Sequence, residues 1–345
     1  MFRLLNHYLH KVPSGRFYTF LSKRINKTNI GMIVSLHSVS NESDVARGSL
    51  NDFIEISADK LEKIIIDFKK MGVMFVTLQE LENALENNNA FSKPVVHFSF
   101  DDGYRNNYLN AFPVLKKYGI PFSIFIVSDF MNNAEPFLWW YMAESIIRNK
   151  QVIEFGKYHF NITADMHNRT SPEALFIQLR DFLLENIDSD REYLEAIIRS
   201  KSRGFKMPET LSWNEMNEMI ASGLCEAGVH TKTHARSSKL TEAETEYEIV
   251  TCREAIFANT GVQSKWFAYS YGSKEDIGNK NMLRRVMKKA GIEMALTTNC
   301  YELNMQSDRY FLPRIFLNNS TSIYTLKTRL NGSYQRSLAQ EGISD

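Results

Sequence analysis

The sequence predicts an α/β fold in which mainly parallel strands form a closed or partly closed barrel. About eight short apolar runs have the length of strands, and segments with helical spacing separate most of them. Polar residues suited to catalysis follow two of these runs, and the catalytic groups of such barrels sit at the carboxyl ends of strands. The strand candidates span residues 32–37, 74–76, 95–100, 122–127, 226–230, 265–269, 294–298 and 311–316.

The segments between the strand candidates carry helix start signals. A serine or threonine followed three residues later by glutamate has the spacing of a capping box, in which each side chain binds the other residue's backbone N–H. One helix is expected to begin after Ser57, to include residues 61–68 and to end at Met71 and Gly72. Capping-box pairs occur at Thr77 and Glu80, at Ser212 and Glu215, and at Thr241 and Glu244.

Residues 131–211 interrupt this alternation, and we interpret them as a helical insertion between two barrel strands. One helix is expected over residues 171–184, because its second residue is a proline, which suits the first turn of a helix. A second helix, charged and amphipathic, is expected over residues 188–201. The insertion is not expected to be an independent domain.

Composition argues against several classes of protein. The formal net charge of +1 disfavours bulk nucleic-acid binding, which usually needs a strongly basic surface. No stretch approaches the roughly 20 apolar residues of a membrane span, and polar residues interrupt every apolar run of the N-terminus, unlike a signal peptide. The three cysteines, Cys225, Cys252 and Cys300, form no CxxC pair, which favours a reducing compartment. We therefore expect a cytoplasmic protein.

The first 28 residues form a basic segment with roughly helical apolar spacing, ahead of a domain expected over residues 29–330. Such a segment can make peripheral contact with the inner membrane face, or it can form two short helices packed on the barrel. Residues 331–345 are expected to be a flexible tail. The basic residues of the segment all precede the first acidic residue, Glu42, and are Arg3, Lys11, Arg16, Lys23, Arg24 and Lys27.

Two adjacent carboxylates, Asp101 and Asp102, follow the strand candidate at 95–100. Like charges this close do not both stay ionised easily unless their roles are separated. A divalent metal ion separates them, because one carboxylate binds the metal while the other accepts a proton from the metal-bound water. The alternative is a plain turn, since Asp and Gly are common where a chain reverses and Gly103 comes next.

A pair of histidines, His230 and His234, stands at the end of the strand candidate at 226–230. Histidines four apart meet on the same side of a helical turn, where both imidazoles can bind one ion. A carboxylate completes a three-ligand site and leaves positions open for water and substrate, which favours metal-assisted hydrolysis. An HxxxH pattern alone is more often a pair of surface or core histidines, so the prediction depends on its combination with the two aspartates.

Four motifs give the chain a resemblance to the polysaccharide deacetylases. SFDDG at residues 99–103 resembles the family's [ST]-F-D-D-G motif, and HTKTH at 230–234 resembles its H-[ST]-x-x-H motif. FAYSYG at 267–272 and LPRI at 312–315 resemble two later motifs, and all of them stand in the family's order. The resemblance implies a NodB-like fold, which is a distorted (β/α) barrel of about seven parallel strands.

The resemblance also implies roles for individual residues. Asp102, His230 and His234 would bind a divalent metal ion, usually Zn²⁺ in this family, and Asp101 would be the general base. The backbone N–H of Tyr271 would help to stabilise the oxyanion. These roles make chemical sense, because a metal ion lowers the pKa of its bound water to about 7 and donors already in place receive the charge that develops on oxygen.

The chain departs from the commonest family pattern in its proton donor. Many members use a late histidine as general acid, but no histidine follows His234 here. In the branch resembling the poly-N-acetylglucosamine deacetylases an early histidine takes that place. We therefore nominate His37, for which the alternative is a core or surface histidine. Arg314 is the candidate for orienting Asp101 through a bidentate contact, with a structural salt bridge as the alternative, and His97 is expected to pack within its strand.

The candidate metal site predicts a metal-dependent hydrolase, and the family resemblance implies that it removes an N-acetyl group from an N-acetylated sugar of a polysaccharide or glycan precursor. One alternative is an O-acetyl esterase or a deformylase acting on a lipid-linked sugar, and another is a carbohydrate-binding relative without catalysis. Aromatic residues ahead of the insertion helices contribute either sugar contacts or core packing, of which packing is the commoner use. They are Trp139, Trp140 and Tyr141.

Overall fold

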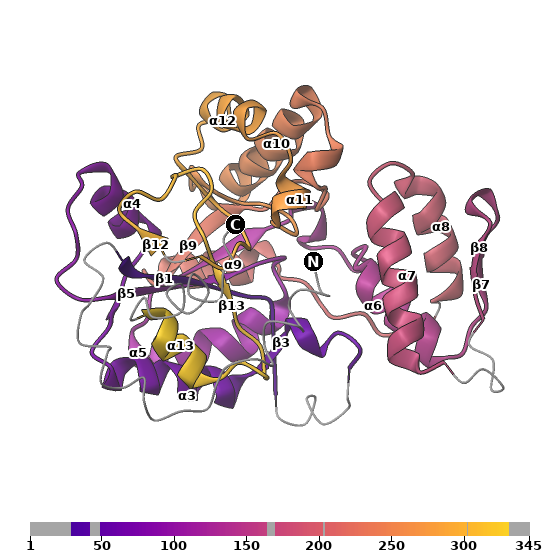
Figure 1. Cartoon of the computed structure of the whole chain (residues 1–345), viewed down its shortest axis with the longest axis horizontal. Coiled ribbons are helices and arrows are strands. Elements are labelled where there is room, and N and C mark those ends of the chain that lie inside the picture. Colours follow the sequence, from indigo (N-terminus) through magenta and orange to yellow (C-terminus); the bar gives the residue numbers. More distant parts are fainter. Residues whose placement is uncertain (1–28, 42–48, 164–169, 203, 302, 331–345) are drawn as a thin grey trace, which may run out of the picture.

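The computed structural model describes residues 29–41, 49–163, 170–202, 204–301 and 303–330. The basic segment predicted at 1–28 and the tail predicted at 331–345 lie outside these residues. In the described part of the chain, no helix is both long and apolar enough to cross a membrane. Figure 1 shows a central sheet flanked by helices and, to its right, a smaller body made largely of helices.

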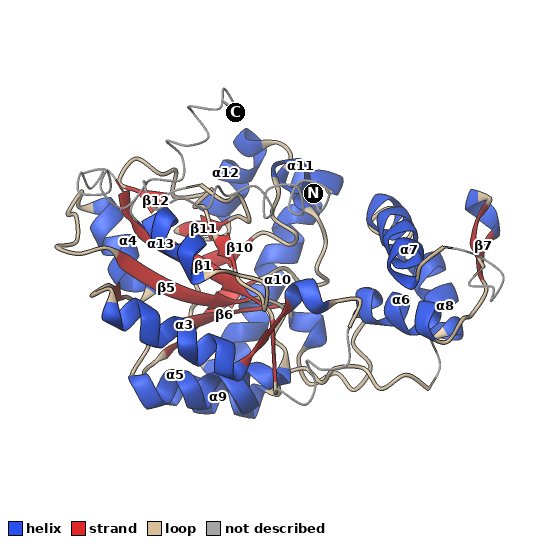
Figure 2. Ribbon diagram, turned by 60° about the horizontal axis from the view of Figure 1, so that its bottom comes forward, coloured by secondary structure: helices blue, strands red, loops and turns tan. Residues whose placement is uncertain are grey.

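A curled half-barrel of mostly parallel strands forms the centre of the protein and confirms the predicted fold class (Figure 2). Its strands follow the order β11-β10-β9-β6-β5-β1-β12, while β4 pairs with β5 and β13 pairs with β1. The pairing of β1 with β12 is antiparallel, and the others are parallel. The bounds are β1 Asn29–Leu36, β4 Met74–Phe75, β5 Val95–Phe100, β6 Phe122–Ile126, β9 Cys225–Val229, β10 Trp266–Ala268, β11 Met294–Leu296, β12 Leu303–Asn304 and β13 Ile315–Phe316.

Every predicted strand candidate overlaps a strand of this sheet, and β5 has the predicted bounds. All residues of β5 are buried, as expected for a strand with both faces covered. The close pairing of β1 with β5 requires a glycine at position 31, because φ is 146° there and a Cβ would collide with the backbone of Val95. The short strands β12, β2 (Ser38–Ser40) and β3 (Glu55–Ser57) were not predicted, since two or three residues show too little pattern.

Helices pack around the sheet, with α10 and α12 along one side and α3 and α5 along the other (Figure 1), and α9 lies next to α5 (Figure 2). The predicted capping boxes are present at the starts of α4, α9 and α10, and the Ser57 side chain caps α3 as expected. The largest hydrophobic core lies between these helices and the sheet. The bounds are α3 Ala58–Lys70, α4 Leu78–Glu86, α5 Phe112–Tyr118, α9 Trp213–Ala221, α10 Glu242–Thr260, α11 Lys274–Ile277, α12 Lys280–Lys289 and α13 Ile323–Leu330.

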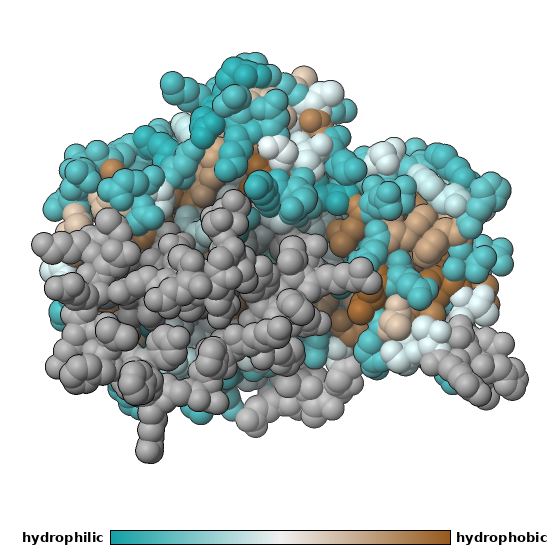
Figure 3. All heavy atoms as spheres, viewed as in Figure 1, coloured by the Kyte–Doolittle hydropathy of each residue, from teal (hydrophilic) through white to brown (hydrophobic). Residues whose placement is uncertain are grey.

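The smaller body in Figure 1 is formed by the segment that we interpret as an insertion. It contains the two expected helices, α7 and α8, together with α6 and an antiparallel hairpin of β7 and β8 that was not predicted. Apolar residues show between polar ones on its surface (Figure 3). The bounds are α6 Trp139–Arg148, β7 Ile153–Phe155, β8 Phe160–Ile162, α7 Pro172–Asn186 and α8 Arg191–Lys201.

The aromatic run at the start of α6 packs in the core of this body. Trp139, Trp140 and Tyr141 are only 5%, 7% and 5% exposed. They belong to a second hydrophobic cluster with residues of α7 and α8, such as Leu179 and Leu194. Of the two alternatives for these aromatic residues, the structure therefore favours core packing.

Candidate active site

The predicted catalytic residues follow the carboxyl ends of several strands of the half-barrel. Asp101 and Asp102 come directly after β5, and His230 comes directly after β9. His37 follows β1, and Tyr271 lies in the loop that follows β10. Because parallel strands end at the same edge of a sheet, side chains far apart in the sequence meet there.

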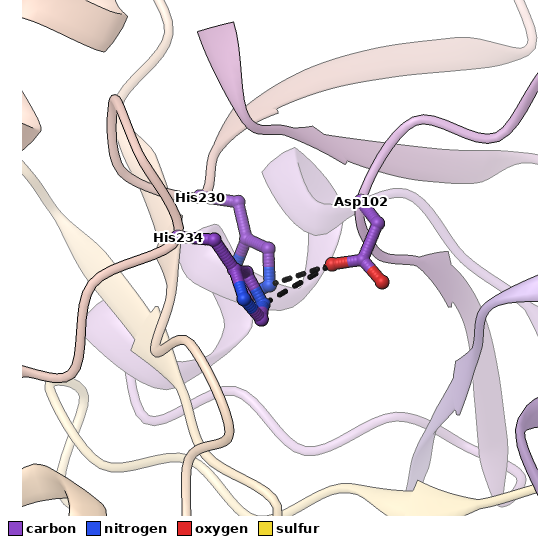
Figure 4. A group of neighbouring side chains, drawn as sticks. All are labelled: Asp102, His230 and His234. Atoms are coloured by element: carbon purple, nitrogen blue, oxygen red, sulfur yellow. Dashed lines mark ion pairs between the residues drawn. The ribbon is translucent and has the colours of Figure 1, made fainter. Parts of the chain in front are cut away.

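Asp102, His230 and His234 converge on one point (Figure 4). Oδ1 of Asp102 lies 3.4 Å from Nε2 of His230 and 3.3 Å from Nε2 of His234. One ligand atom from each residue lies within 4.8 Å of the other two. Three donors this close can share one cation, and a set of two imidazoles and one carboxylate suits Zn²⁺.

The surroundings leave these donor atoms available to a cation. Oδ1 of Asp102 is buried without a hydrogen-bond partner among the described residues, which is costly unless a cation or a proton satisfies it. Nδ1 of His230 lies 2.7 Å from the carbonyl oxygen of Ala268, so Nε2 is the nitrogen that faces Asp102. Burial alone would raise the pKa of Asp102, but His234 and His230 outweigh it and hold this pKa well below its usual value.

The two histidines do not lie on a helical turn, and that part of the prediction is wrong. Residues 230–234 form an irregular loop in which Thr231 and His234 have left-handed φ angles of 70° and 66°. The Thr231 hydroxyl accepts a hydrogen bond from the backbone N–H of His234 at 2.9 Å. This loop, rather than helical spacing, brings the two imidazole rings to 5.1 Å between centroids.

Unusual backbone angles are concentrated at this site. Besides Thr231 and His234, Asp102 and Tyr271 have positive φ angles, of 70° and 61°. Such angles are uncommon for residues other than glycine, and least favourable for a β-branched residue such as threonine. Residues in this conformation persist where surrounding contacts fix them, and they cluster at functional sites.

Asp101 is held by Arg314, the residue predicted to orient it. Nη1 and Nη2 of Arg314 donate to Oδ1 and Oδ2 of Asp101, each at 2.7 Å, and both side chains are buried. Burial alone would raise the pKa of Asp101, but the charges of Arg314 and His230 outweigh it and lower the pKa. The guanidinium also donates to the Thr297 carbonyl at 2.9 Å. A carboxylate kept ionised in a fixed orientation suits a general base.

His37, which follows β1, differs in its hydrogen bonding from His97, which lies within β5. Nδ1 of His37 is buried without a hydrogen-bond partner among the described residues, and its ring lies 5.2 Å from that of Phe316. Burial lowers the pKa of His37, although the charges of Asp102 and Asp101 oppose this shift. Both nitrogens of His97 are paired, with Val76 and Ser123, which confirms the expected structural role of His97.

Tyr271 lies beside His234, one of the candidate metal ligands, with 4.7 Å between their ring centroids. Its hydroxyl accepts a hydrogen bond from Nε1 of Trp139 at 3.1 Å, which fixes the ring. Its backbone N–H makes no hydrogen bond within the described part of the chain. This donor is therefore free to bind an oxygen of a substrate.

Comparison with known families identifies the chain. A family model described as polysaccharide deacetylase matches residues 88–295, which is more than half of the sequence. The chain belongs to the polysaccharide deacetylase family. This finding agrees with the resemblance that its motifs predict.

Curated relatives of this family member come from bacteria. YxkH of Bacillus subtilis is 41% identical over 56 residues, which are 16% of this chain and 20% of that protein. A poly-β-1,6-N-acetyl-D-glucosamine N-deacetylase of Staphylococcus aureus is 25% identical over 158 residues, which are 44% of this chain and 53% of the relative. The chain thus spans about half the length, or less, of these curated relatives.

Solved structures share the fold of this polysaccharide deacetylase family member. The deacetylase PplD of Streptococcus pyogenes, in complex with acetate, has a TM-score of 0.57 at 16% identity, over 87% of this chain and 97% of that one. IcaB of Ammonifex degensii has a TM-score of 0.56 at 20% identity, over 89% of this chain and 97% of the IcaB chain. At these identities the likeness concerns the fold alone, and it agrees with the half-barrel described above.

The contacts that hold the loop with His230 and His234 were not predicted from the sequence. The backbone N–H and hydroxyl of Thr233 donate to the Glu248 carboxylate of α10, at 2.8 Å and 3.0 Å. The Thr233 carbonyl accepts a hydrogen bond from Nη1 of Arg191 on α8 at 2.7 Å. Neither partner stands in a recognisable motif, so only the tertiary structure reveals them.

Proposed function

We propose that this chain hydrolyses the acetamide of an N-acetylated amino sugar in a polysaccharide or glycan precursor, with a divalent metal ion as cofactor. The observation that carries the proposal is the cluster of Asp102, His230 and His234 beside a separate carboxylate that Arg314 holds in place. The name of the Staphylococcus aureus relative supports it, since that protein is a poly-β-1,6-N-acetyl-D-glucosamine N-deacetylase. Membership of the polysaccharide deacetylase family supports hydrolysis of a carbon–nitrogen bond.

Asp102, His230 and His234 would hold the metal ion, for which we propose Zn²⁺. When bound, the ion would polarise the amide carbonyl and lower the pKa of a bound water to about 7. Three protein ligands leave room for water and substrate, as in catalytic sites, whereas structural zinc sites use four protein ligands.

Four further groups would act on protons and developing charge. Asp101 would accept a proton from the attacking water, and Arg314 would keep this carboxylate ionised and correctly oriented. The backbone N–H of Tyr271 would donate to the oxyanion that forms from the carbonyl oxygen. An amine is a poor leaving group until it is protonated, and His37 would supply that proton.

The assignment of His37 as the acid agrees with its environment. Its imidazole has an unpaired nitrogen, and it interacts electrostatically with both aspartates. Burial lowers the pKa of His37, but the charges of Asp102 and Asp101 oppose this shift and so favour the protonated form that a general acid needs. The alternative of a purely structural histidine would leave the unpaired nitrogen without an explanation.

Acetate release tests the proposed function. Chelator-treated protein would be reloaded with Zn²⁺ or Co²⁺ and assayed on a panel of N-acetyl, N-formyl and O-acetyl sugars, including β-1,6-linked N-acetylglucosamine oligomers, with formate measured in place of acetate for the N-formyl sugars. We expect metal-dependent acetate release from the N-acetyl sugars and little activity in the presence of the chelator. Absence of hydrolysis with every metal and substrate would favour a carbohydrate-binding protein instead, and a preference for O-acetyl or N-formyl sugars would change the proposed substrate.

A further inference from the structure

We propose that the insertion positions the metal-ligand loop, by which we mean residues 230–236. It does so through a buried ion pair between Asp188 and Arg236. This inference rests on the proposed function, because Arg236 stands two residues after the proposed ligand His234. It assigns a role to the turn between α7 and α8, which lies in the smaller body rather than in the half-barrel (Figure 1).

Arg236 connects the metal-ligand loop to the carboxyl end of α7. Its Nε donates to Oδ2 of Asp188 at 2.5 Å, and its Nη2 donates to the carbonyl oxygen of Leu184. The side chains of Arg236 and Asp188 are 9% and 4% exposed. A cation is favourable near the carboxyl end of a helix, where backbone carbonyls lack partners, and burial protects the pair from screening by salt.

Arg191 makes a second connection on the other side of His234. Its Nη1 donates to the Thr233 carbonyl at 2.7 Å. Its guanidinium lies 5.2 Å from the ring centroid of Phe137, another residue of the insertion segment. The insertion therefore contacts the loop both directly before and shortly after the ligand histidine.

Arg236 of this ion pair also lies next to Tyr271, whose backbone N–H is the proposed oxyanion donor. The guanidinium of Arg236 lies 5.5 Å from the ring centroid of Tyr271, whose ring is next to that of His234. Asp188, Arg191, His234 and Tyr271 line a common cavity of about 10 Å³. Such a cavity has room for about one water molecule, so these four side chains pack closely at the junction.

The loop needs such support because its backbone is unfavourable. Thr231 and His234 have left-handed φ angles, and their positions must be fixed by surrounding contacts. Glu248 of α10 holds Thr233 from the side of the half-barrel. Asp188 and Arg191 hold the loop from the side of the insertion, so loss of these contacts would free the His234 imidazole from its position beside Asp102.

Metal affinity tests the inference, with a control from the same turn. Asp188→Asn and Arg236→Gln each remove the charge pair, whereas Asp190→Asn removes a carboxylate that binds Lys157 and Tyr158 within the insertion. Competition with a chromophoric chelator would measure the Zn²⁺ affinity of each folded protein. We expect affinity to fall about tenfold or more in the first two variants, as for other supporting contacts of metal ligands, and to stay within about twofold of wild type in Asp190→Asn.

A milder variant and a metal-free measurement complete the test. Arg191→Met removes the bond to Thr233 and keeps the Asp188–Arg236 pair, so it should fold even if the buried-charge variants do not, with a smaller loss of affinity. Hydrogen exchange of residues 230–236 without metal should be faster in Asp188→Asn and Arg191→Met than in wild type or Asp190→Asn. If Zn²⁺ affinity and hydrogen exchange were unchanged in both Asp188→Asn and Arg191→Met, this inference would be overturned and the proposed function would stay intact. A wild-type protein that binds no Zn²⁺ would overturn the proposed function. In that case hydrogen exchange of residues 230–236 would still decide whether the insertion holds the loop.

Discussion

Arg314 and Asp101 form two parallel hydrogen bonds of 2.7 Å inside the protein, although they are 213 positions apart in the sequence. Arg314 directly precedes β13, and the parallel pairing of β13 with β1 places it near the end of β5. A guanidinium that binds both oxygens fixes the plane of the carboxylate as well as its charge. This geometry fits a base-orienting role, and substitution separates that role from a structural salt bridge.

Replacement of Arg314 by lysine keeps the positive charge and removes the two-point contact. We expect kcat to fall by about tenfold or more, because the carboxylate of Asp101 is no longer held in one plane. Zn²⁺ affinity should change little. Arg309→Lys, which alters a partly exposed ion pair with Glu86, is the matched control. If Arg314→Lys lowers the melting temperature while the folded enzyme keeps its kcat, the contact is structural only.

Asp101→Asn removes the proposed base and keeps the size of the side chain. Loss of a general base typically costs a factor of about 10²–10⁴, so acetate release should fall by that amount. Zn²⁺ should still bind, because Asp102, His230 and His234 remain. Turnover near that of wild type in the metal-loaded variant would exclude Asp101 as the base.

His37→Ala should affect substrates according to how much their leaving group needs a proton. An amine must be protonated as it departs, whereas the phenolate of an activated ester leaves without help. We expect hydrolysis of an N-acetyl sugar to slow by about 10²-fold or more and hydrolysis of p-nitrophenyl acetate to slow far less. Equal losses for both substrates would argue that His37 supports the structure and donates no proton.

The buried His97 links the stability of the fold to pH. Burial lowers its pKa from 6.5 to about 4, so the unfolded chain binds a proton at this residue at higher pH than the folded protein does. The free energy of unfolding should therefore fall as pH drops from 6.5 to 4, with about 3 kcal/mol from this group. Urea unfolding measured from pH 6.5 to 4 should show this fall in the free energy of unfolding in the wild type. The fall should be smaller in His97→Gln by the contribution of His97. Parallel pH profiles for the two proteins would contradict it.

Features encoded locally could be predicted from the sequence. The apolar run of β5 and the Ser or Thr with Glu at the starts of α4, α9 and α10 depend on residues a few positions apart. Asp101, Asp102 and His230 could be placed together because each follows a strand, and parallel strands end at one edge. The partnership of Arg314 with Asp101 came from motif resemblance, and the structure adds its geometry.

Features that depend on distant contacts could not be predicted in this way. The spacing of His230 and His234 suggests a helical turn, but threonine at position 231 adopts a left-handed φ that its own chemistry disfavours. Contacts from Glu248 and Arg191, which are remote in the sequence, hold the loop that contains it. The hairpin of β7 and β8 has strands of three residues, too short for a pattern to stand out.

Equilibrium binding of Zn²⁺ to the chelator-treated wild type and to His230→Ala tests the proposed metal site most directly. Elemental analysis after dialysis would give the number of ions per chain, and the melting temperature of the variant would show that it is folded. The proposed site predicts one Zn²⁺ per wild-type chain and loss of that ion in His230→Ala. Full occupancy in the variant, or no bound Zn²⁺ in the wild type, would contradict it.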